Sequence, residues 1–183
     1  MWHYDGKAQL AQRDYFNMNI TKTYYKSPFG VLEFVFYGKK LTELNIDKFE
    51  NLDFSNQKVK PFQANAMNQL QEYFDGKRQI FDMPIVFSKG TEFEQSIWNE
   101  LLEIPFGKRC SYSDVATRIG KDAKSSRAVG RAVGQNPIAI IVPCHRVVGK
   151  KGNLTGFAWG LDRKSFLLHH EQGYTAGVQG QLF

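Results

Sequence analysis

The chain has 183 residues, 42% of them hydrophobic, which is enough to bury the core of one or two small domains. No apolar run approaches the roughly 20 residues that span a bilayer, and the N-terminus lacks the features of a signal peptide. Its two cysteines and four histidines are spaced for neither a disulfide framework nor a metal site. We therefore expect a cytoplasmic protein without metal, cofactor or membrane partner.

The net charge of +6 is unevenly distributed along the chain. Residues 100–165 contain twelve basic and five acidic residues, so this window carries +7, whereas the rest of the chain carries −1. Such asymmetry is typical of a surface that binds a polyanion such as nucleic acid. An ordinary solvated basic face explains the charge equally well at this point.

The first part of the chain, residues 1–88, is predicted to form a small α/β domain. Residues 1–17 show no clear period and are interpreted as a loose extension. β-branched and aromatic residues, together with apolar residues at helical spacing, define the predicted elements. These are strands over residues 21–25, 31–37, 41–46 and 79–85, and a helix over residues 61–74.

The second part, residues 89–183, is predicted to be mainly helical. Thr91 and Glu94 have the spacing of a capping box, so we expect a helix that begins there and stops before Ile104. Two short helices around a glycine-containing turn indicate a helix-turn-helix. A final helix is expected to end near Glu171, with Gly173 as its stop signal. The three later helices are predicted over residues 113–119, 125–135 and 161–171.

The predicted helix over residues 125–135 has an unusual composition. Arg127 and Arg131 lie four residues apart and share one face. Each of its two glycines costs about 1 kcal/mol inside a helix, which favours the close approach of another backbone. The pattern fits a helix pressed against nucleic acid, and it fits tight helix packing with solvated arginines equally well. The two glycines are Gly130 and Gly134.

After Asn136, an apolar stretch leads through Pro143 into Cys144 and His145. A thiol reacts as its thiolate, and a neighbouring base is the usual means of forming one, so Cys144 is a candidate nucleophile. The alternative is that Cys144 is a small core residue, as Cys110 is interpreted to be a packed or surface thiol. Glu171 lies near a helix C-terminus, where a carboxylate is unfavourable, so we expect it to have a partner elsewhere.

Several motifs follow one another in a specific order. They are Ile104-Pro105-x-Gly107, Ser111-Tyr112, Arg127-Ala128-Val129-Gly130, Asn136-Pro137 and Pro143-Cys144-His145-Arg146-Val147. Through them the second half closely resembles the O6-alkylguanine-DNA alkyltransferase family, the methylated-DNA–protein-cysteine methyltransferases. The first half resembles it loosely, through Ser27-Pro28-x-Gly30 and Tyr73-Phe74-x-Gly76-Lys77. The resemblance implies an α+β fold, in which an N-terminal ribonuclease-H-like α/β domain precedes a mainly helical C-terminal domain with a helix-turn-helix.

The resemblance implies direct-reversal DNA repair. One methyl or small alkyl group passes irreversibly from O6 of guanine, and also from O4 of thymine, to Cys144. The implied partner is alkylated double-stranded DNA, bound through its minor groove with the guanine flipped out, and the protein is expected to act as a monomer. The alternative is a non-enzymatic lesion-binding or regulatory helix-turn-helix protein. Cys144 argues against it, because that related branch has tryptophan in place of the acceptor. An unrelated Cys-His hydrolase or redox enzyme leaves the basic helices unexplained.

The resemblance also implies a role for each matching residue. Cys144 is the alkyl acceptor, and His145, through a water, and Glu171 generate its thiolate. Asn136 holds the active-site loop, and Tyr112 donates toward guanine N3. The implied DNA- and base-binding residues are Ser126, Arg127, Ala128, Arg131, Val147, Ala158 and Trp159.

The resemblance implies a specific expectation for several of these positions. Arg127 fills the space that the flipped base leaves in the stack, and the Ala158 backbone N–H lies at guanine O6. The carbonyl oxygens of Cys144 and Val147 accept from the exocyclic amine. Trp159 stands where some relatives have glycine, so we expect its indole to narrow the alkyl pocket. The zinc ligands of some relatives have no counterpart here, which implies a metal-free type.

Overall fold

The computed structural model describes residues 20–28, 30–46, 53–54 and 56–175. The extension predicted over residues 1–17 lies outside these residues. Within the described part, none of the helices combines the length and the apolarity needed to cross a membrane.

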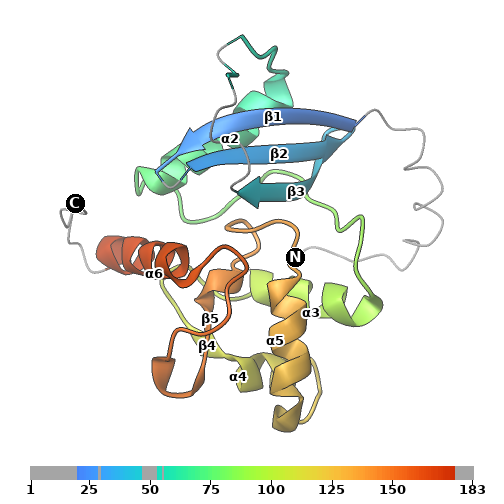
Figure 1. The fold of residues 1–183 in the computed structure, drawn as a ribbon, viewed down its shortest axis with the longest axis vertical. Coiled ribbons are helices and arrows are strands. Elements are labelled where there is room, and N and C mark those ends of the chain that lie inside the picture. Colours follow the sequence, from blue (N-terminus) through green and yellow to red (C-terminus); the bar gives the residue numbers. More distant parts are fainter. Residues whose placement is uncertain (1–19, 29, 47–52, 55, 176–183) are drawn as a thin grey trace.

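The N-terminal part is an antiparallel three-stranded sheet with one helix against it (Figure 1). The strands follow in the order β1 (Ile20–Ser27), β2 (Gly30–Tyr37) and β3 (Lys40–Ile46), and the helix is α2 (Pro61–Phe74). The three strand predictions and the helix prediction are therefore confirmed. Pro61 begins α2 because its fixed φ suits the first helical turn.

The strand predicted over residues 79–85 is wrong. Only one isolated parallel bridge forms there, between Leu41 and Ile85, with hydrogen bonds from Leu41 N to the Pro84 carbonyl and from Val86 N to the Leu41 carbonyl. Pro84 has no N–H group, so a regular ladder cannot continue through it. Ile80 is 79% exposed, which removes the apolar face that a paired strand would bury.

The C-terminal part contains four α-helices around a two-residue parallel ribbon. The elements are α3 (Glu92–Leu102), β4 (Cys110–Ser111), α4 (Tyr112–Arg118), α5 (Ser126–Gly134), β5 (Val147–Val148) and α6 (Leu161–Thr175). The capping box at Thr91 and Glu94 forms as predicted and begins α3. Gly120, with a φ of +72°, ends α4, and α5 follows after a short 3₁₀ turn. This pair is the predicted helix-turn-helix.

Helix α6 runs through Gly173 to Thr175, so the predicted stop at Gly173 is wrong. A glycine ends a helix by adopting a left-handed conformation, and Gly173 does not adopt one. The buried residues Leu167, Leu168 and His170 hold this part of the helix in place. Glu171 consequently lies one turn before the end of the helix rather than at the end.

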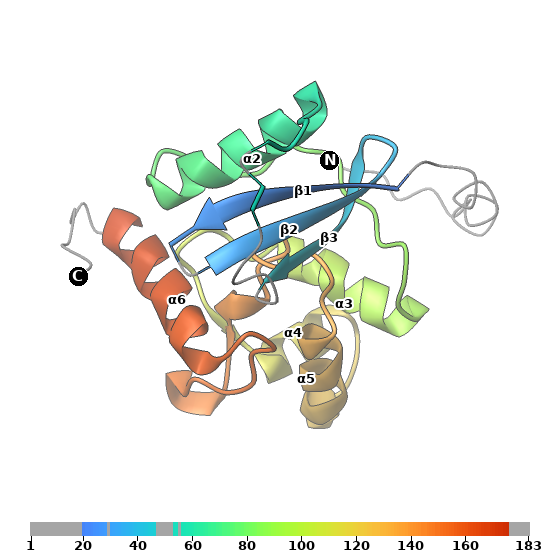
Figure 2. The same cartoon turned by 45° about the horizontal axis from the view of Figure 1, so that its top comes forward.

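One continuous hydrophobic core joins the two parts of the chain. Figures 1 and 2 show α2 on the side of the sheet away from α3, α4 and α5. The segment before Cys144 crosses to the sheet, where the Leu44 N–H donates to the Pro137 carbonyl at 2.8 Å. Ile138, Ile140 and Val142 in this segment are fully buried. The core thus fixes the position of the chain that leads into Cys144.

Candidate active site

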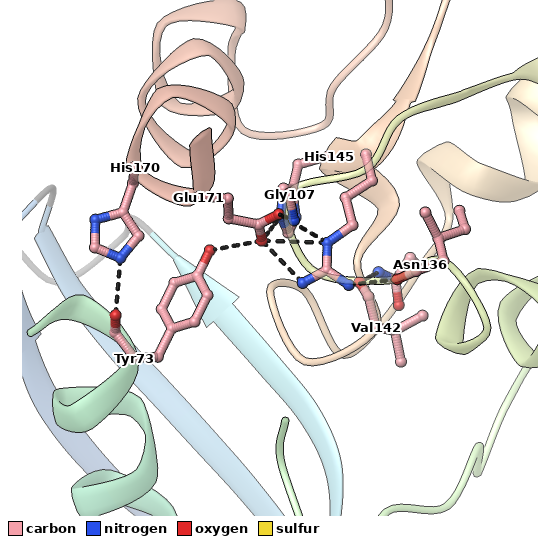
Figure 3. Close-up of polar contacts among 9 residues, drawn as sticks. Tyr73, Gly107, Asn136, Val142, His145, His170 and Glu171 are labelled. Atoms are coloured by element: carbon pink, nitrogen blue, oxygen red, sulfur yellow. Dashed lines mark hydrogen bonds and ion pairs between the residues drawn. The ribbon is translucent and has the colours of Figure 1, made fainter. Parts of the chain in front are cut away.

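Cys144 begins a short 3₁₀ turn, Cys144–Arg146, and its sulfur is held by Asn136. Asn136 Nδ2 lies 3.0 Å from Cys144 Sγ and donates to the Val142 carbonyl at 2.8 Å. Asn136 Oδ1 accepts from the Ile138 N–H at 3.0 Å. One amide side chain therefore ties together the start and the end of the segment that carries the cysteine (Figure 3).

The same segment contains a strained turn. Ile140 has a φ of +68°, and the Ile141 N–H donates to the Ala139 carbonyl at 2.8 Å across it. This conformation is rare for a β-branched residue and costs on the order of 1–3 kcal/mol. Complete burial of Ile140 offsets the cost. The chain before Cys144 is therefore shaped by packing rather than by local preference.

Both the thiol and its neighbouring imidazole are neutral at rest. Burial raises the pKa of Cys144, and the hydrogen bond from Asn136 and the charge of Lys164 partly oppose that rise. Burial lowers the pKa of His145, against the opposing effect of Glu171. A thiolate must therefore be generated by proton transfer within the site.

Glu171 collects donors from three separate segments (Figure 3). Its Oε1 atom accepts from the hydroxyl group of Tyr73 at 3.0 Å and bonds His145 Nε2 at 2.8 Å. Its Oε2 atom accepts from the Gly107 N–H at 3.0 Å and from Arg146 Nε at 2.9 Å. Arg146 Nη2 also donates to Oε1 at 2.9 Å. These are the partners that the position of Glu171 near a helix C-terminus led us to expect.

These donors determine the charge of Glu171 and the tautomer of His145. Burial by itself favours the neutral acid, but the bonds from His145 and Arg146 outweigh it and hold the pKa of Glu171 well below its usual range. An ionised carboxylate only accepts, so Nε2 of His145 carries a hydrogen. Nδ1 is then the free base nitrogen of the neutral ring. It is buried and has no hydrogen-bond partner among the described residues.

Lys164 is a buried cation beneath the active-site loops. Its Nζ atom donates to the Val147 carbonyl at 2.6 Å and to the Thr155 carbonyl at 2.7 Å. Burial lowers the pKa of Lys164 to about 8, although the charge of Cys144 acts in the opposite direction. One side chain on α6 thus joins β5 to the loop before α6. The carbonyl of Val147, expected to face the base, accepts from Lys164 in this structure.

Tyr112 begins α4 and closes the other side of this loop. Its hydroxyl group donates to the Thr155 carbonyl at 3.0 Å. A Cβ added at Gly130 would lie 3.6 Å from the Tyr112 ring, and one added at Gly134 would meet nothing within 4 Å. Among the described residues, no other protein backbone therefore approaches either glycine closely. Gly130 faces an aromatic ring, and Gly134 borders open space beside the active site.

A small cavity of about 10 Å³ adjoins the cysteine. The half-buried indole of Trp159 forms part of its wall and meets the Phe157 ring edge-on at 5.6 Å. Ala158 is exposed beside it. The lining residues are Val133, Gly134, Asn136, Ala139, Cys144, Gly156, Phe157, Ala158 and Trp159. Ala158 and Trp159 thus lie at the space beside the sulfur.

Helix α5 presents its basic face to solvent. Arg127, Ala128 and Arg131 are exposed, and Ser126 is half-buried. The opposite face is anchored on α3, where Trp98 Nε1 donates to the Ala132 carbonyl at 2.8 Å. The four predicted DNA-binding residues of α5 therefore lie together on one helix, separate from the buried Cys144 network.

Tyr73, Arg146 and Lys164 were not predicted as site residues. Lys164 lies seven residues before Glu171, so helical spacing places both on one face of α6, and this was a usable signal. Arg146 belongs to the motif around Cys144 but has no local pattern that reveals its bond to Glu171. Tyr73 gives no local signal, because its partner is 98 positions away.

Models of protein families match both parts of the chain. The DNA-binding domain of 6-O-methylguanine DNA methyltransferase matches residues 92–173, and its ribonuclease-like domain matches residues 20–87. The chain belongs to the 6-O-methylguanine DNA methyltransferase family. The family and the fold class expected from the motifs are therefore confirmed. Among the residues that the structure describes, no group of three or more His, Cys, Asp or Glu side chains could hold a metal ion.

Individual members of the family agree with this assignment. The methylated-DNA–protein-cysteine methyltransferase of Methanosarcina barkeri is 47% identical over 135 residues, which cover 74% of this chain and 79% of that protein. The Haemophilus influenzae protein of the same name is 40% identical over 82% of this chain and 85% of its own length.

Solved structures extend the comparison to the fold. Mycobacterium tuberculosis O6-methylguanine methyltransferase aligns with a TM-score of 0.74 and 39% identity, over 85% of this chain and 94% of its own. The M. tuberculosis protein solved in complex with DNA aligns with a TM-score of 0.73 and 41% identity, over 82% and 92% of the two chains.

Proposed function

We propose that this chain repairs alkylated DNA by transferring a methyl or small alkyl group from O6 of guanine, and from O4 of thymine, to Cys144. The observation that carries the proposal is the placement of Cys144 in a small cavity beside a buried His145–Glu171 pair. Relatives that match most of this chain are named methylated-DNA–protein-cysteine methyltransferases, and one family member was solved with DNA. Each molecule acts once, because the thioether formed has no route back to the thiol.

In the reaction we propose, the proton of Cys144 moves to His145 Nδ1 through a bridging water. Nδ1 is the base nitrogen of the ring, and a buried polar atom of this kind is commonly satisfied by water. The charge of Glu171 then stabilises the imidazolium that forms, across a distance of 2.8 Å. Asn136 and Lys164 stabilise the thiolate on the other side.

The thiolate attacks the alkyl carbon in line with O6. The S–C bond forms as the C–O bond breaks, and the electron pair passes into the guanine ring, which takes up a proton. A donor near the ring lowers the cost of that charge, and Tyr112 is the candidate donor. Its hydroxyl group has to turn from the Thr155 carbonyl to reach the base, because it donates there in the free protein.

A base inside a duplex cannot reach a sulfur whose residue is only 5% exposed, so the damaged nucleotide must leave the stack. Helix α5 supplies the surface for this step. Its exposed Arg127 fills the space that the base vacates, and Arg131 contacts a phosphate while α5 lies in the minor groove. One protein molecule is sufficient for this arrangement.

Intact-protein mass measured after mixing with a methylated duplex oligonucleotide tests the proposal. We expect a gain of one methyl group per molecule, on Cys144, and no turnover afterwards. An unmodified mass with retained binding to the lesion would favour the non-enzymatic alternative.

A further inference from the structure

One hydrogen bond joins the N-terminal domain directly to the charged network of the active site. Tyr73 lies in the last turn of α2, and its hydroxyl group donates to Glu171 Oε1 at 3.0 Å (Figure 3). Both residues are fully buried. The reaction proposed above uses Glu171 but gives the phenol of Tyr73 no role.

The surroundings of Tyr73 keep its hydroxyl group on that oxygen. Its ring meets Phe106 edge-on at 6.1 Å and Phe81 at 5.5 Å. Its backbone carbonyl accepts from His170 Nε2 at 2.8 Å. Because His170 directly precedes Glu171, α2 and α6 are joined twice at adjacent residues. Rotation of the phenol away from Glu171 would disrupt this packing.

Tyr73 and His145 meet on the same carboxylate oxygen. The Tyr73 hydroxyl group lies 3.0 Å from Glu171 Oε1, and His145 Nε2 lies 2.8 Å from it. A hydrogen bond donated to a carboxylate favours its charged form and lowers its affinity for a proton. The phenol therefore reduces the proton affinity of the His145–Glu171 pair. Other charged or titratable groups facing the pair are Arg146, Lys164, His170 and Cys144.

The phenol acts as a neutral donor throughout the working pH range. Burial and the charge of Glu171 raise the pKa of Tyr73 well above its ordinary value, despite the opposing charge of Arg146. Its contribution to the pair therefore does not change with pH, whereas the protonation of the pair does. This separates Tyr73 from the groups that titrate.

We propose that Tyr73 is a positioning residue of the alkyl-transfer reaction, which acts through Glu171 to set the lowest pH at which His145 can accept the proton of Cys144. The inference rests on the proposed function. A His145–Glu171 pair that has already taken a proton from solvent cannot accept one from the thiol. By weakening that uptake, the N-terminal domain extends the active range toward acid pH.

Tyr73→Phe tests this role, because it removes the hydroxyl group and keeps the ring. The single-turnover rate of methyl transfer is followed by intact mass on a methylated duplex, from about pH 5 to about pH 9. We expect the acid midpoint of the pH–rate profile to rise by roughly one pH unit in the variant. The thermal midpoint, measured alongside, establishes that the variant is folded at the assay temperature.

Two matched variants separate this role from a structural one. Tyr25→Phe removes another phenol that contacts α2, where it donates to Gln71 Oε1 at 2.7 Å. Phe81→Leu loosens the packing around the Tyr73 ring and keeps its hydroxyl group. An upward shift of the acid midpoint in Tyr73→Phe alone supports the proposal.

An acid midpoint that is unchanged or lowered in Tyr73→Phe overturns the proposal. An upward shift in Phe81→Leu equal to that in Tyr73→Phe also overturns it. In either case, with methyl transfer intact in the wild type, only the role of Tyr73 is refuted. A wild-type protein that gains no methyl group at any pH refutes the proposed function as well.

Discussion

The sulfur of Cys144 lies 3.0 Å from the side-chain nitrogen of Asn136, eight residues earlier in the chain. The same Asn136 nitrogen donates to the Val142 carbonyl. One residue, Asn136, therefore contacts both the sulfur and the backbone that leads to it. Cys144 also forms part of the wall of the cavity.

Cys144→Ala is expected to abolish methyl transfer and to leave DNA affinity nearly unchanged, because we propose that the exposed face of α5 binds the DNA. Cys110→Ala is the matched control. Burial raises the pKa of Cys110 to about 11, so that thiol stays protonated and should accept nothing. Intact mass and a binding isotherm measure the two properties. Methyl found on Cys110 would contradict the assignment.

Arg127 and Arg131 are both exposed on α5, yet they should differ in effect. Arg127→Ala is expected to slow transfer from duplex DNA far more than transfer from free O6-methylguanine, since only the duplex requires extrusion of a base. Arg131→Ala should mainly lower the affinity for DNA. The slope of the logarithm of the binding constant against the logarithm of the salt concentration should become shallower by about one. Single-turnover rates of both variants on duplex DNA and on free O6-methylguanine test this difference. Equal effects of the two variants on both substrates would argue against the role of Arg127.

Glu171→Gln is expected to destabilise the fold by about 3–5 kcal/mol at neutral pH, because it leaves Arg146 buried without its anion. The folded-state pKa of Glu171 is depressed below its ordinary value of 4.5. Its stabilising effect is therefore complete above that value and is lost as the pH falls. Below pH 4.5, the difference in unfolding free energy between wild type and variant should narrow by about 1.4 kcal/mol for each pH unit. Urea unfolding at several pH values measures this, and a constant difference would contradict it.

Trp159→Gly is expected to increase the rate of inactivation by O6-benzylguanine. The indole forms part of the wall of the cavity at Cys144, and forcing a larger group against such a wall costs about 1–3 kcal/mol. Methyl transfer should continue in the variant. Inactivation rates of both proteins, measured beside their thermal midpoints, test this expectation. A variant that is less stable but reacts no faster would show that the indole supports the fold without limiting the substrate.

Local patterns were sufficient for most of the secondary structure. β-branched and aromatic residues predicted the strands β1, β2 and β3, apolar residues at helical spacing predicted α2, and the capping box marked the start of α3. Two predictions failed because other contacts overrode the local signal. Pro84 allows only one bridge where a strand was expected. Packing of α6 against the core carries the helix past Gly173.

The sequence by itself determined the family and the basic helix, and it indicated Cys144 as the candidate acceptor, because these residues lie in short ordered motifs. Only the tertiary structure decided how the charges around Cys144 are balanced. Tyr73, Gly107 and Arg146 meet at Glu171 from segments far apart in the chain. A hydrogen bond between such distant residues leaves no periodicity in the sequence. It exists because the shared core brings α2, α6 and the turn at Cys144 together, and burial then favours the pairing of polar groups there.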